Sequence, residues 1–381
     1  MRIGIDATNI GGGGGVTHLK EILANFKNDD QSVNIKSIVV FSSSFILNQL
    51  DDSFFIKKVT FPFLNKSLIH RILFQLFQFD KEISNRCDIL FSITGDYTGS
   101  FKPLVGMSQN MLLYEREIWR EINNFKEIFR FWVIFQKQKK CFKNSLGIIF
   151  ISNFAKNYII NCLNLKNKDL IIINHGISPR FVGVTKKQLS IKKYSFNNPF
   201  KLLYVSTVHV YKHQWNVIKA VADLRQKGIP IELNLVGGII FKSSGKKMVN
   251  TINEVDPTQT FIKYHGNILY TKIESFYKNT DGIIFASTCE NMPNILIESM
   301  ASGNPIVCSN KEPMPEFLKD GGFYFNSQSS KSIEKAILNM LKSPKHREEM
   351  IIKNLQEIEK YSWLRSSKET LNFLSDIYIK N

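Results

Sequence analysis

Two glutamates stand in the last third of the chain, Glu290 in a polar stretch and Glu298 eight positions later. The apolar run 281–285 before them predicts a buried strand, and 294–301 reads as a helix, so strand, loop and helix follow in that order. A carboxylate binds hydroxyl groups through charge-assisted hydrogen bonds of roughly 1.5–3 kcal/mol each. The pair therefore fits a neutral, hydroxyl-rich group such as a hexose or a ribose.

The start of the predicted helix is a second binding feature. A helix N-terminus presents unpaired N–H groups and a partial positive charge, and phosphate binds there readily. The residues at this terminus are Met292, Pro293, Asn294 and Ile295. Taken singly, Glu290 could be a solvated loop residue and Glu298 a charge that suits the helix dipole. The whole segment favours a site for a sugar joined to a phosphate.

The segment from Glu290 to Pro305 resembles the retaining GT-B glycosyltransferases of family 4. Their C-terminal domains carry Glu, seven residues, Glu, and a small-residue run ending in Gly-x-Pro. The resemblance implies that Glu290 contacts the donor hexose, that Glu298 contacts the ribose, and that the backbone between them lines the diphosphate. This chain has 291–294 in place of the family's usual glycine-rich loop, so the identity of the donor stays open.

Lys212 follows a predicted strand, 202–206, and precedes a predicted helix. Such a strand-to-helix loop would aim the ammonium group at the same site, although an isolated lysine is usually a solvated surface residue. The resemblance implies that Lys212 meets the donor diphosphate, where a fixed cation stabilises the departing phosphate by several kcal/mol. Many relatives have an Arg five positions earlier, where this chain has Thr207. A protonated His209 could replace the missing charge.

Two further loops are expected to read the nucleotide base. They follow the second and third strands predicted in the C-terminal half, and they contain Gly237 in one and 264–268, with Asn267, in the other. Backbone groups in such loops can bind the edge of a purine or a pyrimidine. The sequence favours neither base.

In the N-terminal half, five consecutive glycines, 11–15, follow the predicted strand 3–7. Glycine permits positive φ and close backbone approach, so a phosphate or sugar could lie against Gly14 and Gly15. The alternative is a flexible loop without a ligand. The dinucleotide fingerprint is excluded, because the spacing differs and no acidic residue follows the second strand near Phe41.

Relatives often place a His after the strand that begins at Val105, close to the reacting hexose, but this chain offers Gln109 and Asn110. An amide binds hydroxyl groups but is neither acid nor base near neutral pH. We therefore assign no protein nucleophile and expect Asn110 to position the hexose. For a retaining transferase the resemblance then implies front-face displacement. Ser152, after the predicted strand 147–151, is another candidate, and His175, after the predicted strand 170–173, is either a site residue or a packed loop histidine.

A chain of 381 residues exceeds what one core usually supports. Strand-like and helix-like runs alternate, which predicts an α/β protein with two parallel, doubly wound sheets. The strand-like runs are 3–7, 37–41, 88–92, 147–151, 202–206, 231–236, 261–264, 283–286 and 305–308. We expect the GT-B arrangement of two Rossmann-like domains facing a central cleft. The predicted domains are an acceptor-side domain (1–183), a nucleotide-sugar domain (184–361) and a C-terminal helix (362–381) that packs back on the first domain.

The net charge of +17 would suit a partner that is negatively charged, such as nucleic acid or an anionic membrane. The chain has no recognised nucleic-acid module, so nucleic acid is not expected. The segment Phe125 to Lys143 interleaves aromatic with basic residues. It is either an amphipathic helix on an anionic membrane or a buried helix with a solvated basic end.

The sequence predicts no membrane span, because no run of 18 apolar residues lacks charges, and no signal peptide, because Met1-Arg2 leads straight into a strand. Five cysteines without a Cys-x-x-Cys pair suit a reducing cytosol. We expect a cytoplasmic protein, at the inner face of the membrane if the basic helix binds lipid. No metal cluster or cofactor is expected besides the donor substrate.

These features predict a retaining, metal-independent hexosyltransferase of bacterial surface polysaccharide synthesis. It would move a hexose from a nucleoside diphosphate sugar to a saccharide or lipid-linked acceptor. A sugar-nucleotide epimerase or phosphorylase on the same fold is the alternative enzyme. A basic nucleic-acid-binding protein is the alternative from another class.

Overall fold

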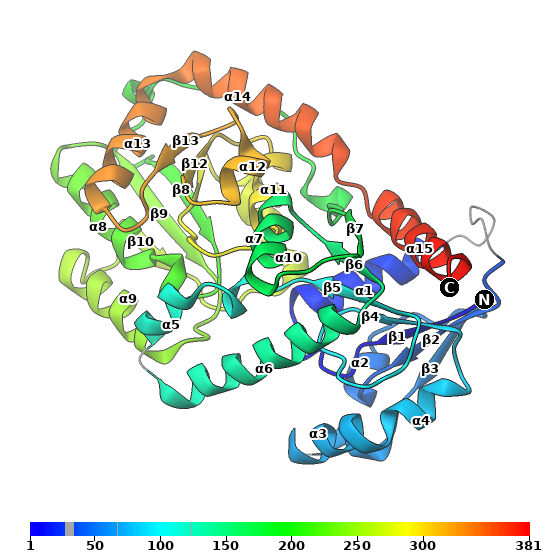
Figure 1. Ribbon diagram of the computed structural model, residues 1–381. Coiled ribbons are helices and arrows are strands. Elements are labelled where there is room, and N and C mark those ends of the chain that lie inside the picture. The colour runs from blue at the N-terminus through cyan, green and yellow to red at the C-terminus, as the bar shows by residue number, and fades with distance from the viewer. Residues whose placement is uncertain (27–33, 67, 123) are drawn as a thin grey trace. The chain divides into compact units, whose positions relative to one another are not determined.

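Short, wholly buried apolar runs form the central strands of this chain. In the computed structural model, which describes residues 1–26, 34–66, 68–122 and 124–381, every residue of β4 (Ile89–Ser92) and β11 (Gly282–Phe285) is buried. Burial on both faces is typical of parallel strands that helices cover on both sides. Two separate sheets are built in this way (Figure 1).

The chain divides into two units. The first consists of Met1–Trp119, residues 124–176 and Tyr361–Asn381. Its other strands are β1 (Arg2–Asp6), β2 (Ser37–Phe41), β3 (Ile56–Val59), β5 (Leu104–Ser108), β6 (Gly147–Phe150) and β7 (Asp169–Ile172). Its helices are α1 (Gly14–Ala24), α2 (Ser44–Leu47), η2 (Pro62–Asn65), α3 (Leu68–Phe77), α4 (Phe79–Ser84), η3 (Met111–Leu113), α6 (Phe125–Asn144), α7 (Asn153–Leu163) and α15 (Trp363–Ile379). Helix α5 (Arg116–Ile122) begins in this unit, and its last three residues group with the second.

The seven strands of the first sheet are parallel, in the order β3-β2-β1-β4-β5-β6-β7. The order reverses direction between β1 and β4, so the loops after these two strands diverge at one edge. Helix α15 returns to this unit at the end of the chain and packs on α1, where Ser367 Oγ donates to the carbonyl oxygen of Ile22 at 2.8 Å.

The second unit holds Ile177–Lys360 with Arg120–Ile122. Its remaining strands are β8 (Phe200–Val205), β9 (Ile231–Val236), β10 (Ile262–Tyr264), β12 (Ile306–Ser309) and β13 (Phe323–Phe325). Its helices are η4 (Pro179–Phe181), η5 (Ile191–Lys193), η6 (Val210–Lys212), α8 (Gln214–Gln226), α9 (Lys242–Val255), α10 (Tyr270–Lys278), α11 (Asn294–Ala301), α12 (Met314–Leu318), α13 (Ser330–Lys342), α14 (Pro344–Glu357) and η7 (Ile358–Lys360). Its six parallel strands run β10-β9-β8-β11-β12-β13, and the order reverses between β8 and β11.

The prediction of two parallel, doubly wound sheets is confirmed. The bounds of β2, β9 and α11 agree with the sequence to the residue, and the other predicted strands shift by one or two positions. Strands β3 and β13 were not predicted. Both lie at sheet edges, where burial is partial and the apolar signal is short or broken by lysines.

Candidate functional site

The strand reversal of the second sheet brings together the two charged residues that the sequence singled out. Lys212 ends η6, which follows β8, and Glu290 lies in the loop after β11. Lys212 Nζ forms an ion pair with Glu290 Oε1. Ligands of open α/β sheets bind outside the carboxyl ends of the strands at such a switch point. The pair therefore lies where the fold favours a small-molecule site.

The backbone around this pair is held by buried hydrogen bonds. The hydroxyl of Tyr204, inside β8, donates to the carbonyl oxygen of Lys212 at 2.7 Å. The Thr288 N–H donates to the carbonyl oxygen of Tyr211 at 2.9 Å, which joins the β11 loop to η6. Burial, and then the charge of Glu290, raises the pKa of Tyr211, so its hydroxyl stays neutral. The pair is thus preorganised in a place of low dielectric, where attraction between charges is strong.

The side chain of Lys212 is 7% exposed and that of Glu290 is 18% exposed. The centres of the Tyr211 and Phe285 rings lie 5.1 and 5.3 Å from Lys212 Nζ, within the range of a cation–π interaction. Two opposite charges at this depth neutralise each other. A phosphate that enters beside them can share the ammonium group, and a sugar hydroxyl can donate to the carboxylate.

Helix α11 begins at Asn294, shortly after Glu290 in the sequence. Its N-cap is Pro293, which has no side-chain group to bind the first N–H donors, and its first turn holds no acidic residue. The dipole of α11 thus presents partial positive charge at Asn294 and Ile295. This geometry suits an anion beside Lys212.

Glu298 lies in the second turn of α11 and is buried. The hydroxyl of Tyr270, at the start of α10, donates to Glu298 Oε1 at 2.8 Å, and the Arg180 guanidinium lies 5.5 Å from the centre of the Tyr270 ring. Burial raises the pKa of Glu298 to about 7, although the Tyr270 hydrogen bond and Arg180 lower it in part. Glu298 therefore titrates near neutral pH. Tyr270 and Arg180 were not predicted from the sequence.

The two loops predicted to read the base lie side by side. The N–H of Gly237 donates to the carbonyl oxygen of Gly266 at 2.8 Å, and the Tyr264 hydroxyl donates to the carbonyl oxygen of Gly237 at 2.9 Å. Gly237 has φ of 143°, and a Cβ there would lie 2.0 Å from the carbonyl oxygen of Ser206. Only glycine allows this close approach. At the next position, Gly238 lies beside Asn267 of the other loop.

His209, which was expected to replace a missing charge, caps η6 through its side chain. Its Nδ1 accepts the N–H of Val210 at 2.9 Å, and its role toward a donor stays a prediction. The ring is buried against Phe241 and Tyr211. Thr207 is exposed. Its carbonyl oxygen accepts from Gln214 Nε2 at 3.0 Å, so its backbone orders the loop between β8 and η6.

In the first unit, the glycine run occupies the loop between β1 and α1. Gly12 and Gly13 have φ of 148° and 64°, and Gly14 and Gly15 form the first turn of α1. Gln109 Nε2 donates to the carbonyl oxygen of Ile93 at 3.0 Å. The exposed Asn110 caps η3, because its Oδ1 accepts the N–H of Leu112 at 3.0 Å. This bond fixes the direction of the Asn110 side chain, and its role toward a hexose stays a prediction.

Ser152 and His175 make contacts within the first unit. Ser152 caps α7 by accepting the N–H of Ala155 at 3.1 Å. His175 is buried with its Nε2 3.2 Å from Nδ1 of His18, and its ring stacks on Trp363. Burial lowers the pKa of His18, so this histidine stays neutral. The sequence did not single out His18, which lies far from His175 along the chain.

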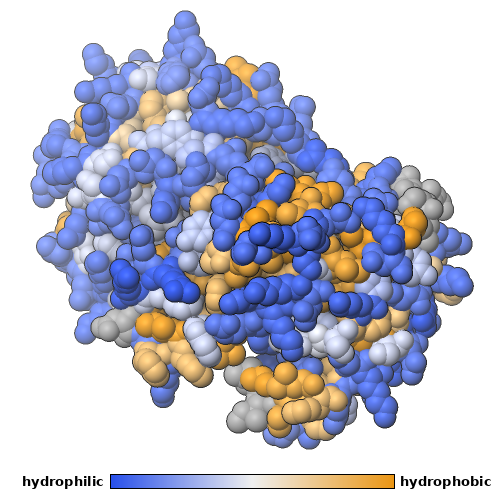
Figure 2. All heavy atoms as spheres, viewed as in Figure 1, coloured by the Kyte–Doolittle hydropathy of each residue, from blue (hydrophilic) through white to orange (hydrophobic). Residues whose placement is uncertain are grey.

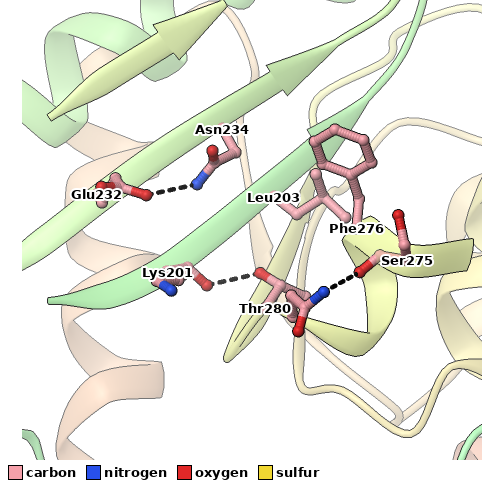
Figure 3. Close-up of a pocket in the computed structure, with 8 residues that line it drawn as sticks. Lys201, Leu203, Glu232, Asn234, Ser275, Phe276 and Thr280 are labelled. Atoms are coloured by element: carbon pink, nitrogen blue, oxygen red, sulfur yellow. Dashed lines mark hydrogen bonds between the residues drawn. The ribbon is translucent and has the colours of Figure 1, made fainter. Parts of the chain in front are cut away.

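A pocket of about 240 Å³ lies on the second sheet beside α10, and none of the predicted site residues lines it (Figure 3). Its polar groups bond to one another: Asn234 Nδ2 donates to Glu232 Oε1 at 2.9 Å, and Thr280 Oγ1 donates to the carbonyl oxygen of Lys201 at 2.7 Å. The pocket is therefore separate from the site at the carboxyl ends of the strands.

Two absences hold for the part of the chain that the structure describes. In it, no three His, Cys, Asp or Glu residues are grouped so that they could hold a metal ion. Likewise, none of the described helices combines the length and the apolar character needed to cross a membrane.

Residues 186–357 match the family described as glycosyl transferases group 1. The chain is 21% identical over 230 residues to O-antigen chain mannosyltransferase B of Escherichia coli, covering 59% of each chain. It is 23% identical over 232 residues to the capsular polysaccharide biosynthesis glycosyltransferase CapM of Staphylococcus aureus, covering 58% of each chain. The matches thus span less than two thirds of these relatives.

Among solved structures, HepE of Anabaena in complex with UDP-glucose matches with a TM-score of 0.73 at 15% identity. The match covers 99% of this chain and 100% of that chain. Such a likeness shows the fold, which is GT-B with two Rossmann-like units. The family match contains all of β8 to β13 and both glutamates. The second unit of the chain is therefore similar to the glycosyl transferases of group 1 over residues 186–357.

Proposed function

We propose that this protein is a glycosyltransferase that takes a hexose from a nucleoside diphosphate sugar. The observation that carries the proposal is the Lys212–Glu290 ion pair at the strand reversal between β8 and β11. The pair sets a cation and a hydroxyl acceptor beside the N-terminus of α11. A sugar joined to a diphosphate carries both matching groups, anionic oxygens and neutral hydroxyls, in one molecule.

Each part of the donor has a proposed partner in the second unit. Lys212 and the first amides of α11 bind the diphosphate, and Glu290 accepts hydrogen bonds from the hexose. Glu298 accepts hydrogen bonds from the ribose hydroxyls in its ionised form. The base lies against the Gly237 loop and Asn267, because these two loops already pack together. Support for the class of donor comes from HepE, which was solved with UDP-glucose.

We propose retention of configuration without a covalent enzyme intermediate. The bond between the hexose C1 and the donor phosphate oxygen breaks while a bond from C1 to the acceptor oxygen forms on the same face. The acceptor proton passes to the departing phosphate oxygen. Lys212 stabilises the charge that develops on this oxygen. In this proposal the reaction uses no metal ion.

The proposed acceptor is a saccharide or a lipid-linked saccharide at the inner face of a membrane. The names of two relatives support this class of acceptor, since one acts on O-antigen and the other serves capsular polysaccharide synthesis. We accordingly place the protein in the synthesis of surface polysaccharide.

Thermal unfolding of the full chain with a panel of nucleoside diphosphate sugars tests the donor. The correct donor at a hundred times its dissociation constant should add about 2.7 kcal/mol to the stability. That donor is then incubated with saccharide acceptors, with and without a chelator, and the anomeric configuration of the product is read by NMR. Failure of every donor to stabilise the protein, or unchanged transfer by both Glu290→Ala and Glu298→Ala, would reject the proposal.

A further inference from the structure

Helix α6 carries an exposed stripe that is aromatic at one end and basic at the other. Phe125, Phe129 and Trp132 are 82%, 55% and 49% exposed, and they recur at helical spacing on one face. The same face continues with Lys140 and Lys143, which are also exposed. The opposite face packs into the first unit through Phe131, Phe135 and Phe142. The helix is therefore anchored by one side and presents the other.

A second helix presents apolar side chains in the same unit. In α3, Leu73, Leu76 and Phe77 are 50%, 52% and 77% exposed. Helices α3 and α6 are joined, because Lys137 Nζ of α6 donates to Gln75 Oε1 of α3 at 3.0 Å. Figure 2 shows apolar residues gathered over α3 and over the first turns of α6. The sequence had indicated the α6 segment alone.

The charge of these two helices is predominantly positive. Helix α6 contains six basic residues and one acidic residue, Glu127, which pairs with Arg130. No residue of α3 is acidic, and Arg71 adds a further positive charge. Long basic side chains beside interfacial aromatic rings bind anionic head groups while the rings enter the acyl boundary.

We propose that the exposed faces of α3 and α6 form one docking surface for an anionic membrane. A second copy of the chain is a poorer occupant, because it would bring two strongly positive helices together. A lipid surface instead supplies negative charge and an apolar layer at once. None of the residues involved belongs to the candidate donor site, so the inference goes beyond the proposed transfer and does not depend on it.

Flotation of the full chain with vesicles tests the proposal. Binding is expected to phosphatidylcholine vesicles that contain phosphatidylglycerol, and not to phosphatidylcholine alone. The double variant Lys140→Gln/Lys143→Gln should weaken partitioning about thirtyfold. The control is Lys242→Gln/Lys246→Gln, which removes the same charge from exposed positions of α9 and should change partitioning less than about twofold.

The contribution of α3 is tested by Leu76→Ser/Phe77→Ser, which should weaken partitioning at least about tenfold. The matched control is Ile352→Ser/Phe54→Ser, since these side chains are 51% and 96% exposed outside α3 and α6. All variants are first checked for unchanged thermal unfolding, so that lost binding is not lost folding.

Trp132 provides a direct reading of insertion. Trp215 and Trp363 are buried, and Trp119 donates to the carbonyl oxygen of Leu112 at 2.6 Å. Anionic vesicles should shift the emission of the wild-type chain to shorter wavelength and leave Trp132→Phe unshifted.

Three results would overturn the proposal. One is a wild-type chain that does not bind anionic vesicles. Another is equal loss of binding in the test and control doubles, which would mean that net charge alone drives adsorption. The third is a dimer in analytical ultracentrifugation that the α3 and α6 doubles abolish, which would assign the surface to a second copy.

Discussion

Lys212 and Glu290 follow neighbouring strands of the second sheet, and their side chains meet where the strand order reverses. Neither group is strongly exposed. Each charge therefore offsets the free-energy cost of removing the other from water. The pair thus holds a structural role before any ligand arrives, and a diphosphate would share an ammonium group that already has a partner. The two roles can be measured separately, the structural one by the stability of the fold and the proposed catalytic one by turnover.

Removing one member of the pair should destabilise the protein. Lys212→Met leaves a largely buried carboxylate, and Glu290→Gln leaves a largely buried ammonium group, so each should lower the free energy of unfolding by roughly 3 kcal/mol. The double variant should lose clearly less than the sum, since no unpaired charge remains. Urea unfolding followed by circular dichroism measures all three.

The control for this cycle is the exposed pair Lys380–Asp169, whose side chains are 61% and 46% exposed. Lys380→Met should change stability by less than about 1 kcal/mol. Additive losses at Lys212 and Glu290 would contradict the coupling. In the proposed reaction all three site variants lose turnover, including the double variant that regains stability, because catalysis needs both groups.

The affinity for the donor nucleotide should depend on pH through Glu298. Its pKa is raised to about 7 in the folded protein because the carboxyl group is buried, so the neutral form prevails below this pH. A raised folded pKa stabilises the fold below the unfolded pKa, and this contribution is lost as the pH rises through about 7. Ribose binding needs the ionised form, so affinity should rise between about pH 5.5 and 7.5 and then level off. Calorimetric titration across this range gives the profile.

Two variants sharpen the pH experiment. Glu298→Gln keeps the shape but cannot ionise, so its nucleotide affinity should be weak and flat with pH. Tyr270→Phe removes the hydrogen bond that favours the ionised form, so the rise in affinity should move to higher pH. A rise of the same size and midpoint in Glu298→Gln would assign the titration to another group.

Pattern and position along the chain were enough to single out Lys212 and Glu290, but not Tyr270 or His18. Lys212 and Glu290 both follow strands that were readable as apolar runs, and parallel strands bring their carboxyl ends to one edge. Tyr270 was missed because only the packing of α10 beside α11 shows that its hydroxyl reaches Glu298. His18 was missed for the same reason, since helical periodicity marks it as inward-facing but does not identify His175 as its neighbour.

The glycine run of the first unit should tolerate alanine at one position and not at another. Gly13 has φ of 64° and ψ of −143°, a backbone conformation that residues other than glycine rarely adopt. Gly13→Ala should therefore lower the free energy of unfolding by about 1–3 kcal/mol. Gly11 lies outside the positive-φ region and has open space around it, so Gly11→Ala should be neutral or stabilising by about 0.5 kcal/mol. Thermal unfolding compares the two. Equal effects would mean that the loop does not hold this backbone in solution.

Neighbouring glycines give the sharpest test of the loop after β9. A Cβ on Gly237 would lie 2.0 Å from the Ser206 carbonyl oxygen, whereas a Cβ on Gly238 would lie 3.5 Å from Asn267 Cβ, an ordinary contact. Gly237→Ala should therefore force the β9 loop away from the β8 loop, cost roughly 3 kcal/mol, and weaken the binding of nucleoside diphosphates about tenfold or more. Gly238→Ala should keep the stability within about 1 kcal/mol. Because its methyl group points toward Asn267, any effect on binding should differ between purine and pyrimidine nucleotides. Equal loss of affinity for every nucleotide in Gly238→Ala would place the base elsewhere.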